Sequence, residues 1–244
     1  VRSRGLGDVY KRQAVPSLLG LVVTWGVIAW KYRGQWADGK GLPADPPDGL
    51  PPWNPWQSSK ALCLTGVLFI VFLFTGLPRD IVALGAAGIL LMSRRMHSRT
   101  MLGLVDWQLL VLFCGLFVVN HALQQTRVPD LAVAELLRLG VDPAHPGWLF
   151  AITVMLSNAV SNVPATILLL PVAHHPLAGP ILALSSTLAG NLLIIGSIAN
   201  IIVVESAAAH GIRISWRNHA PTGITVTVLT LAIAALTLWL FSHA

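Results

Sequence analysis

Two clusters of small polar residues interrupt otherwise apolar sequence between residues 148 and 200. The first polar cluster, residues 157–164, reads Ser-Asn-Ala-Val-Ser-Asn-Val-Pro, and the second polar cluster, residues 190–200, opens with Gly-Asn and closes with Gly-Ser-Ile-Ala-Asn. At membrane depth, polar side chains are costly unless they line a cavity or bind something. Their amide and hydroxyl oxygens can coordinate a small cation such as Na⁺, and their amide N–H groups can bind an anion. The two clusters therefore indicate an intramembrane binding site.

Each cluster has the chemistry of a helix interruption. Ser161 or Asn162 is suited to cap a helix that has Pro164 in its first turn, where a missing N–H group costs nothing. The N-terminus of that helix would point its free N–H groups and positive dipole end at the middle of the membrane, which favours a carboxylate or oxyanion. In the second polar cluster, Gly190 and Gly196 allow a break in the helix, and nearby oxygens can reach that break.

These features nominate the site residues. The expected substrate ligands are Ser157, Asn158, Ser161, Asn162, Asn191 and Asn200. The expected ion ligands are Ser161, Asn162, Gly190, Gly196 and Ser197, with Na⁺ as the only metal ion in view. The alternative for either cluster is a contact between packed helices, where small and amide residues are common. Asn120 and His121 are interpreted as interface polarity, and the hydroxyls at residues 185–187 as packing or back-bonded groups.

Neither cluster contains Asp, Glu, Lys or Arg. Coupling to a cation would therefore rest on neutral oxygens, which favours Na⁺ over H⁺ unless another half of the protein holds a carboxylate. His174 and His175 are expected in a surface turn, and Glu205 at a membrane interface. The sequence has no Gly-x-Ser-x-Gly or His-Glu-x-x-His motif, so neither an enzyme nor a cofactor other than the coupling ion is expected.

The composition is that of a polytopic membrane protein. Of the 244 residues, 55% are hydrophobic and 11% are charged, whereas soluble domains carry about 25% charged residues. The formal net charge of +6 would suit nucleic acid, but the basic residues lie in loops between apolar runs, where membrane orientation explains them. Cys63 and Cys114 lie in separate apolar runs, so two buried free thiols are expected.

The apolar runs predict an all-α fold with about six transmembrane helices and one re-entrant helical hairpin. The spans are expected at residues 14–30, 61–77, 81–93, 104–123, 180–208 and 222–241. Residues 148–173 contain two apolar legs of about ten residues, one on each side of the first polar cluster. Each leg covers roughly 15 Å as a helix, about half the hydrocarbon thickness, which predicts the hairpin. The helix at 180–208 is expected to be broken at the second polar cluster.

Two segments lie outside these spans. Residues 1–13 are polar and Arg-rich, begin without Met and resemble a translated sequencing-adapter read-through, so we set them aside as non-native. Residues 31–60 are rich in Trp, Pro and Gly, which predicts a connector outside the membrane. The alternative for this connector is a segment that docks a partner.

The distribution of positive charge predicts the orientation. With residues 1–13 left out and the hairpin entering and leaving on one side, nine Lys and Arg residues fall on one side of the membrane and three on the other. The richer side is predicted to be cytoplasmic. The chain is therefore expected as a multi-pass protein of the cell membrane, inner or plasma, with its connector inside and its C-terminus outside.

Three stretches of the sequence resemble the ion transporter superfamily. They are Asp106-Trp107 with residues 109–117, the first polar cluster with Ala165, and residues 186–200. The superfamily includes citrate transporter-like domains, divalent anion:sodium symporters, and the branch of arsenite permeases and sodium/proton antiporters. The resemblance implies a secondary carrier built from inverted repeats, with a re-entrant hairpin and a broken helix in each repeat, that works by alternating access.

The resemblance also implies roles for residues and partners. In the symporter branch a Ser-Asn-Thr tip contacts Na⁺ and the substrate carboxylate, and the matching positions are Ser161, Asn162 and Val163, where valine lacks the threonine hydroxyl. Residues 61–244 are similar to a C-terminal repeat, and residues 14–30 to the last helix of an N-terminal repeat. The expected partners are therefore the lipid bilayer, a small anion, and the missing N-terminal repeat or a second copy in a homodimer, but not nucleic acid.

The expected function is secondary active transport of small anions, such as di- or tricarboxylates or oxyanions, coupled to Na⁺. The first alternative is an arsenite permease or a carrier similar to Na⁺/H⁺ antiporters. The second alternative is a membrane scaffold that does not transport.

Overall fold

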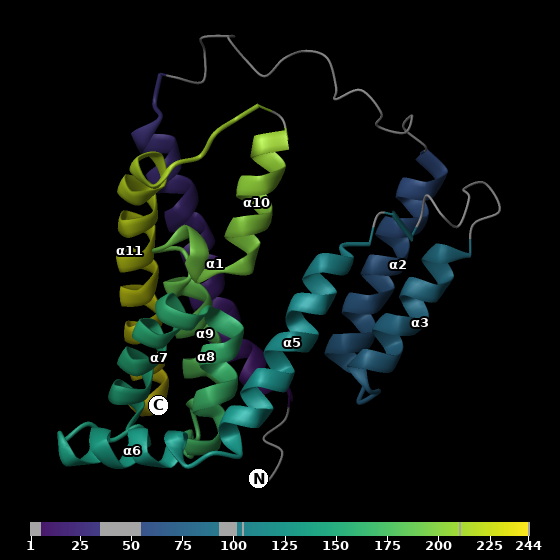
Figure 1. The fold of residues 1–244 in the computed structure, drawn as a ribbon. Helices are drawn as coiled ribbons and strands as arrows, with labels where there is room; N and C mark the ends of the chain where they lie inside the picture. Colours follow the sequence, from purple (N-terminus) through teal and green to yellow (C-terminus); the bar gives the residue numbers. More distant parts are fainter. Residues whose placement is uncertain (1–5, 35–54, 93–101, 104, 210, 244) are drawn as a thin grey trace. The chain divides into compact units, whose positions relative to one another are not determined.

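The computed structural model describes residues 6–34, 55–92, 102–103, 105–209 and 211–243, and within these ranges the regular secondary structure is helical (Figure 1). The α-helices are α1 (Leu6–Lys31), α2 (Pro55–Phe74), α3 (Arg79–Leu91), α5 (Trp107–Gln124), α6 (Val128–Arg138), α7 (Pro146–Val160), α8 (Asn162–Leu169), α9 (Ala178–Ala189), α10 (Ile198–Ala209) and α11 (Trp216–His243). Two 3₁₀ turns, η1 (Leu170–Val172) and η2 (Ile194–Gly196), follow α8 and α9. The predicted all-α class is confirmed.

The chain divides into two compact units. The small unit comprises residues 43–114, and the large unit comprises residues 1–42 and 115–244, so both polar clusters lie in the large unit. In the small unit, α2 packs on α3, and Lys60 Nζ donates to the carbonyl oxygen of Ile89 at 2.7 Å. Most of the predicted connector, at residues 35–54, lies outside the described residues.

In the part of the chain that the structure describes, four helices have the length and apolar character needed to cross a membrane, at residues 12–31, 55–74, 107–124 and 216–242. The expected span at 81–93 corresponds to α3, whose 13 residues cover roughly 20 Å against a hydrocarbon thickness of about 30 Å. Helix α1 begins at Leu6, inside the segment that we set aside, and the non-native origin of that segment stays a prediction. Cys63 and Cys114 are free but exposed on their helices, so their expected burial is wrong.

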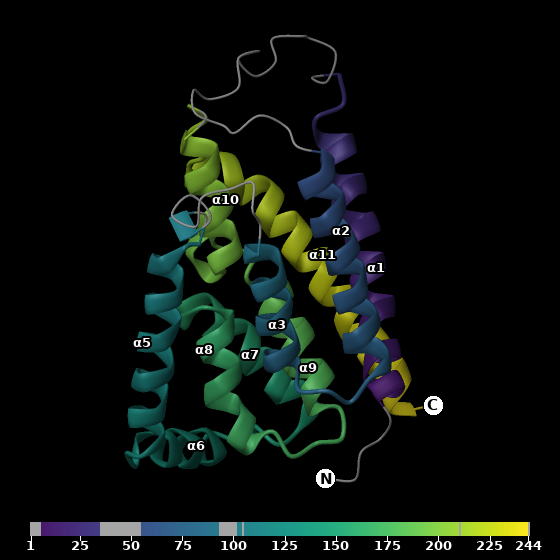
Figure 2. The ribbon, with the colours of Figure 1, turned by 90° about the vertical axis from the view of Figure 1, so that its right-hand side faces the viewer.

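The stretch predicted as a hairpin forms two short antiparallel helices. Helices α7 and α8 meet at Ser161, pack against each other, and both pack on α9 (Figures 1 and 2). Pro171 lies in the 3₁₀ turn that ends the second leg, as expected of a residue that lacks the N–H group of a helical hydrogen bond. Helix α9 also stops short of a full span, and the chain continues through residues 190–197 into α10.

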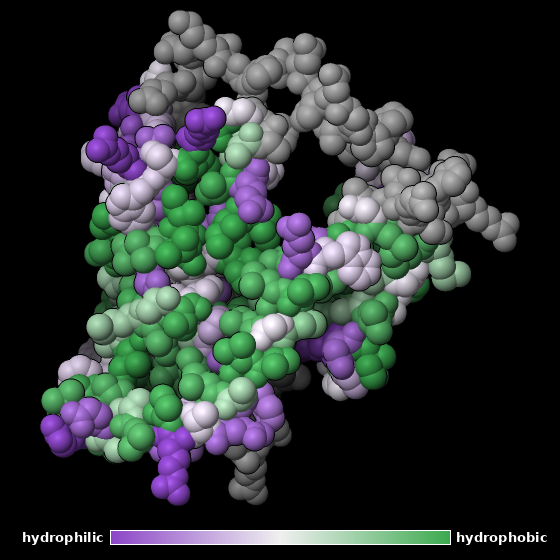
Figure 3. Space-filling view, in the orientation of Figure 1, coloured by the Kyte–Doolittle hydropathy of each residue, from purple (hydrophilic) through white to green (hydrophobic). Residues whose placement is uncertain are grey.

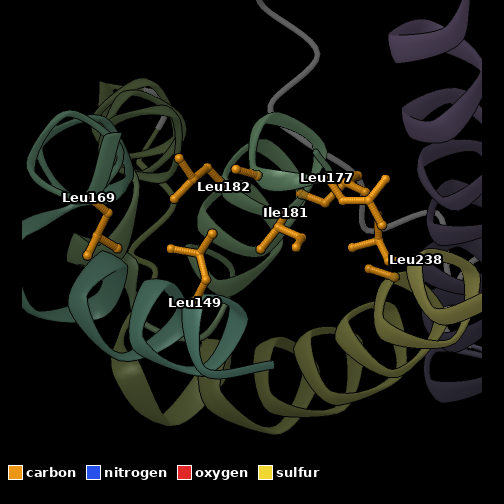
Figure 4. Packing of buried hydrophobic residues seen from close by; sticks show 9 residues of the cluster. Leu149, Leu169, Leu177, Ile181, Leu182 and Leu238 are labelled. Carbon is orange, nitrogen blue, oxygen red and sulfur yellow. The ribbon is translucent and has the colours of Figure 1, made fainter. Parts of the chain in front are cut away.

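Buried leucine and isoleucine side chains hold the hairpin in the large unit. Figure 4 shows the side chains from α7, α8, α9 and α11 that pack together: Leu149, Leu169, Leu177, Ile181, Leu182 and Leu238. Lipid tails are as apolar as these side chains, so inside a membrane they stabilise the fold through close van der Waals contact more than through exclusion of water. The packing fixes the two legs of the hairpin against the first half of the broken helix.

Helix α1 lies antiparallel to α11 along much of its length (Figures 1 and 2). The Arg12 guanidinium lies 5.9 Å from the centre of the Phe241 ring, whereas at the other end Lys31 Nζ donates to Thr222 Oγ1 at 2.8 Å. Between them, a Cβ placed on Gly20 would lie 3.5 Å from Thr230 Cγ2, which is an ordinary contact distance. Small residues in the middle therefore let the two helices approach closely.

The surface of the large unit is consistent with a lipid environment. Figure 3 shows hydrophilic residues gathered near α6 and at the end where α1 finishes and α11 begins, with mainly hydrophobic surface between them. Large apolar side chains on α11 remain exposed, among them Val228, Leu236, Trp239 and Leu240. An exposed apolar surface of this extent marks a contact with membrane or protein.

Candidate functional site

The junction between α7 and α8 is strained at a serine. Ser161 has φ 75° and ψ 160°, and no other non-glycine residue in the described ranges has a positive φ. This backbone region is essentially limited to glycine, and a residue held there costs about 1–3 kcal/mol. Ser161 occupies the cap position of α8 but makes no side-chain capping hydrogen bond. Asn162, the first residue of the helix, accepts the N–H of Val163 at Oδ1, 3.0 Å away. Pro164 follows in the first turn, as predicted.

An unpartnered oxygen lies where the two polar clusters meet. Asn158 Nδ2 donates to the carbonyl oxygen of Val154 at 3.0 Å, whereas Asn158 Oδ1 is buried without a hydrogen-bond partner among the residues described. A Cβ placed on Gly196 would lie 3.0 Å from this oxygen. A buried acceptor left unsatisfied costs about 1–3 kcal/mol. The structure thus brings Asn158 of the first cluster against Gly196 of the second.

Gly190 and Gly196 serve close approach more than backbone conformation. Gly190 has an ordinary φ of −59°, and a Cβ on it would lie 3.0 Å from Ser197 Cβ and 3.2 Å from the carbonyl oxygen of Gly196. A Cβ on Gly196 would in turn lie 3.2 Å from the carbonyl oxygen of Gly190. The helix is broken where we predicted, but the glycines are needed because the two ends of the break touch.

Polar side chains close the break and anchor the hairpin. Asn200 Nδ2 donates to the carbonyl oxygens of Gly190 at 2.8 Å and Leu193 at 3.3 Å. The fully buried Ser157 donates from Oγ to the carbonyl oxygen of Ser186 on α9 at 2.7 Å. Thr166 Oγ1 lies 3.2 Å from Ser186 Oγ. Ser157 and Asn200 therefore have structural hydrogen bonds, and their predicted contact with substrate stays a prediction.

Asn191 is turned toward α11 through a contact that sequence reasoning missed. His219 Nε2 lies 2.9 Å from the carbonyl oxygen of Asn191, and because a carbonyl only accepts, this ring nitrogen carries the proton. A Cβ on Gly223, one helical turn after His219, would lie 2.6 Å from Nε2. The available signal was the spacing of four between His219 and Gly223 in an apolar helix, which leaves room for the ring.

Two further buried polar groups lack partners among the described residues, Asn120 Nδ2 and Thr227 Oγ1. Asn120 is only 5% exposed, so its interpretation as interface polarity is wrong. One turn later, Gln124 Nε2 donates to the carbonyl oxygen of Ile167 on α8 at 3.4 Å, so Asn120 lies on the part of α5 next to the hairpin. By contrast, Ser185 Oγ donates to the carbonyl oxygen of Ile181 at 2.6 Å, as expected of a back-bonded hydroxyl.

Within the described ranges, no group of three or more His, Cys, Asp or Glu residues is placed to hold a metal ion. The oxygens and N–H groups of the two clusters are neutral. This arrangement can bind a small ion or an anion, with the N-terminus of α8 contributing its positive dipole end.

The sequence model of one protein family, described as citrate transporter, matches residues 4–182. The chain belongs to the citrate transporter family. Its resemblance to the ion transporter superfamily is thereby confirmed. The matched residues include the first polar cluster and end within α9, before the second polar cluster. No solved structure matches the chain.

Curated relatives include one named as a membrane protein and others named as transporters. The chain is 28% identical over 201 residues to a 46 kDa membrane protein of Mycobacterium leprae, covering 77% of this chain and 47% of the relative. It is 29% identical over 182 residues to the candidate transporter arsB of Dictyostelium discoideum, covering 71% and 32%, and 28% identical over 203 residues to the human P protein, covering 71% and 24%. The chain thus spans less than half the length of each of these relatives.

Proposed function

We propose that this protein is a secondary active transporter of small anions, such as di- or tricarboxylates or oxyanions, coupled to Na⁺ and working by alternating access. The observation that carries the proposal is the buried, unpartnered Asn158 Oδ1 beside Gly196, next to a strained residue at the hairpin tip. A folded protein retains such costs where a ligand offsets them.

The geometry supports a division of labour at the junction. Asn158 Oδ1 and carbonyl oxygens at the C-terminal end of α7 are acceptors, which suit Na⁺. The N-terminus of α8, at Asn162 and Val163, presents donors and a positive dipole end, which suit a carboxylate or oxyanion. A cation at the acceptors would also attract the anion, so the two ligands would bind together, which is the basis of symport.

Transport would require more than this chain provides. The hairpin and the broken helix resemble one repeat of an inverted-repeat carrier, and the chain spans 47% of its Mycobacterium leprae relative. The second half of the site would come from an N-terminal repeat or from a second copy in a homodimer. In the cell membrane, the predicted orientation places the ends of α1 and α10 and the start of α11 inside, and the C-terminus outside.

An arsenite permease or an antiporter-like carrier is the alternative. The similarity to a relative named arsB favours it. Proton coupling would then use a group outside the two polar clusters, because both clusters lack a charged residue.

The test is thermal stabilisation of the full-length protein by Na⁺ with citrate, succinate, sulfate, phosphate or arsenite, with K⁺ replacing Na⁺ as the control. A ligand present at about 100 times its dissociation constant should add roughly 2.7 kcal/mol to the free energy of unfolding. We expect a Na⁺ effect that grows with one anion, and that Asn162→Ala reduces it. The exposed amide change Gln108→Ala should leave it intact.

Two results would count against the proposal. Stabilisation that follows pH but not Na⁺ would favour the proton-coupled alternative. An absence of any Na⁺-dependent response to every anion, together with no effect of Asn162→Ala, would refute Na⁺ symport at the hairpin tip.

A further inference from the structure

We propose that a cavity in the large unit, between α1 and the start of α11, binds an oxyanion group and is an approach site to the helix break. This cavity, the α1–α11 vestibule, has a volume of about 400 Å³ and is lined by residues that include Tyr32, Asn191, Asn218, His219 and Thr222. Its volume falls in the range of small-molecule sites, which is about 300–1,000 Å³. The approach role rests on the proposed function, but oxyanion binding does not.

The rim of the vestibule carries a cation without an acidic partner. Lys31 Nζ donates to Thr222 Oγ1 at 2.8 Å, and Tyr32 OH lies 3.4 Å from the same oxygen. An ammonium group has three donors, so two remain for a ligand. The residues that line the vestibule include no Asp or Glu, and the ion pair found in the described part of the chain, Arg138 with Glu135, lies on α6.

Amide and hydroxyl groups in the lining complete the chemistry. His219 Nε2 donates to the carbonyl oxygen of Asn191 at 2.9 Å, which orients the ring but leaves no N–H of the neutral imidazole for a ligand, and the centres of the His219 and Trp216 rings lie 6.1 Å apart. The side chains of Asn191 and Asn218 add amide groups to the lining. A cavity lined by hydroxyls and amides, with an ammonium group at its rim and no carboxylate in its lining, favours a sulfate, phosphate or carboxylate group.

The contact with Asn191 connects the vestibule to the second polar cluster. An anion bound beside His219 would lie next to the residue whose carbonyl oxygen the imidazole holds. The basic groups nearest in sequence to the lining residues are Lys31 at the end of α1, Arg33 just after it, Arg213 before α11 and Arg217 on α11.

The experiment measures binding of radiolabelled sulfate to the purified chain in phosphatidylcholine nanodiscs, at neutral pH and with K⁺ as the only cation. We expect Lys31→Met to weaken binding about tenfold or more and Lys31→Arg to retain it. The exposed Arg138→Gln, which removes a cation on α6, should leave binding unchanged.

A second arm identifies the source of the oxyanion. If a lipid headgroup enters the vestibule, nanodiscs that contain phosphatidylglycerol should bind less sulfate than phosphatidylcholine nanodiscs at the same salt concentration. If only a free anion enters, the two kinds of nanodisc should bind sulfate equally. Either result is consistent with an oxyanion site that depends on Lys31.

Three results would refute oxyanion binding in the vestibule. These are no sulfate binding in either lipid, binding that Lys31→Met leaves unchanged, or binding that requires Na⁺ and Asn158 but not Lys31. The last result would place the anion at the polar clusters, so it would support the proposed function while refuting the vestibule. If the thermal response to Na⁺ and anions were absent but sulfate binding still depended on Lys31, the vestibule would be supported and the proposed function refuted.

Discussion

The two polar clusters look alike in sequence but differ in whether their polar atoms are hydrogen-bonded. In the second cluster, Asn200 Nδ2 binds two carbonyl oxygens across the break, and His219 binds the carbonyl oxygen of Asn191. In the first cluster, Asn158 Oδ1 has no partner in the described structure, and Ser161 is strained. The break is therefore internally satisfied, whereas the hairpin tip carries costs that a ligand could offset. Under the proposed function, the first cluster would bind the ligand, while the hydrogen bonds of the second cluster hold the break together.

The largest expected effect comes from the contact that joins the clusters. Gly196→Ala would place a Cβ 3.0 Å from Asn158 Oδ1 and 3.2 Å from the carbonyl oxygen of Gly190. Because the Asn158 side chain and the carbonyl group of Gly190 must each give way slightly to relieve this, we expect a loss of about 2–3 kcal/mol, within the range of overpacking costs. In a chain of this size that corresponds to a fall in melting temperature of roughly 4–12 °C, measurable by thermal denaturation.

Gly179→Ala is the matched control. Gly179 lies in the first turn of α9, and a Cβ there would meet nothing within 4 Å, so the change should stay within about 0.5 kcal/mol. Equal effects of the two substitutions would mean that Gly196 is not a point of close approach, and the contact between the clusters would be refuted.

The next prediction distinguishes the structural role of Asn200 from the proposed binding role of Asn158. Asn200→Ala leaves the carbonyl oxygens of Gly190 and Leu193 without their donor, so we expect a loss of about 2 kcal/mol with or without Na⁺. Asn158→Ala removes an unpaired oxygen, so the stability without Na⁺ should stay the same or rise by about 1 kcal/mol, while the stabilisation by Na⁺ disappears. Thermal denaturation of both variants in Na⁺ and in K⁺ measures all four values.

The opposite pattern would reverse the assignment of the clusters. If Asn200→Ala abolished the response to Na⁺ at unchanged stability, the ion would bind at the break. The exposed Gln108→Ala provides the control for loss of an amide in a helix, and it should alter neither quantity.

The sequence predicted the elements better than the contacts between them. Apolar runs and prolines anticipated the hairpin at residues 148–173, which the structure has as α7, α8 and η1, and the broken helix at 180–208. The close approach of Gly196 to Asn158 could not be predicted, because it depends on the register of two elements that are distant in sequence. His219 was missed for the same reason, since its partner is a backbone carbonyl group on another element.

The glycines show a second limit of sequence reasoning. Glycine is the residue expected at a positive φ, yet the break uses Gly190 with an ordinary backbone, and the hairpin tip uses Ser161 with φ 75°. Residue type indicated that the backbone was unusual in this region. It did not identify the strained position, because the surrounding packing imposes that conformation on a serine.

The smallest expected effect follows from this strain. Ser161→Gly should relieve about 1–3 kcal/mol of backbone strain and lose about 0.5–1 kcal/mol through the greater freedom of glycine in the unfolded chain, for a net gain of about 1 kcal/mol. Ser59→Gly, the same change within α2, should instead lower the stability by about 0.5 kcal/mol. If the serine hydroxyl binds Na⁺, Ser161→Gly will be more stable in K⁺ and less responsive to Na⁺. A variant that is destabilised in K⁺ would show that the conformation of Ser161 is not strained, which would remove one of the two costs that distinguish the hairpin tip from the break.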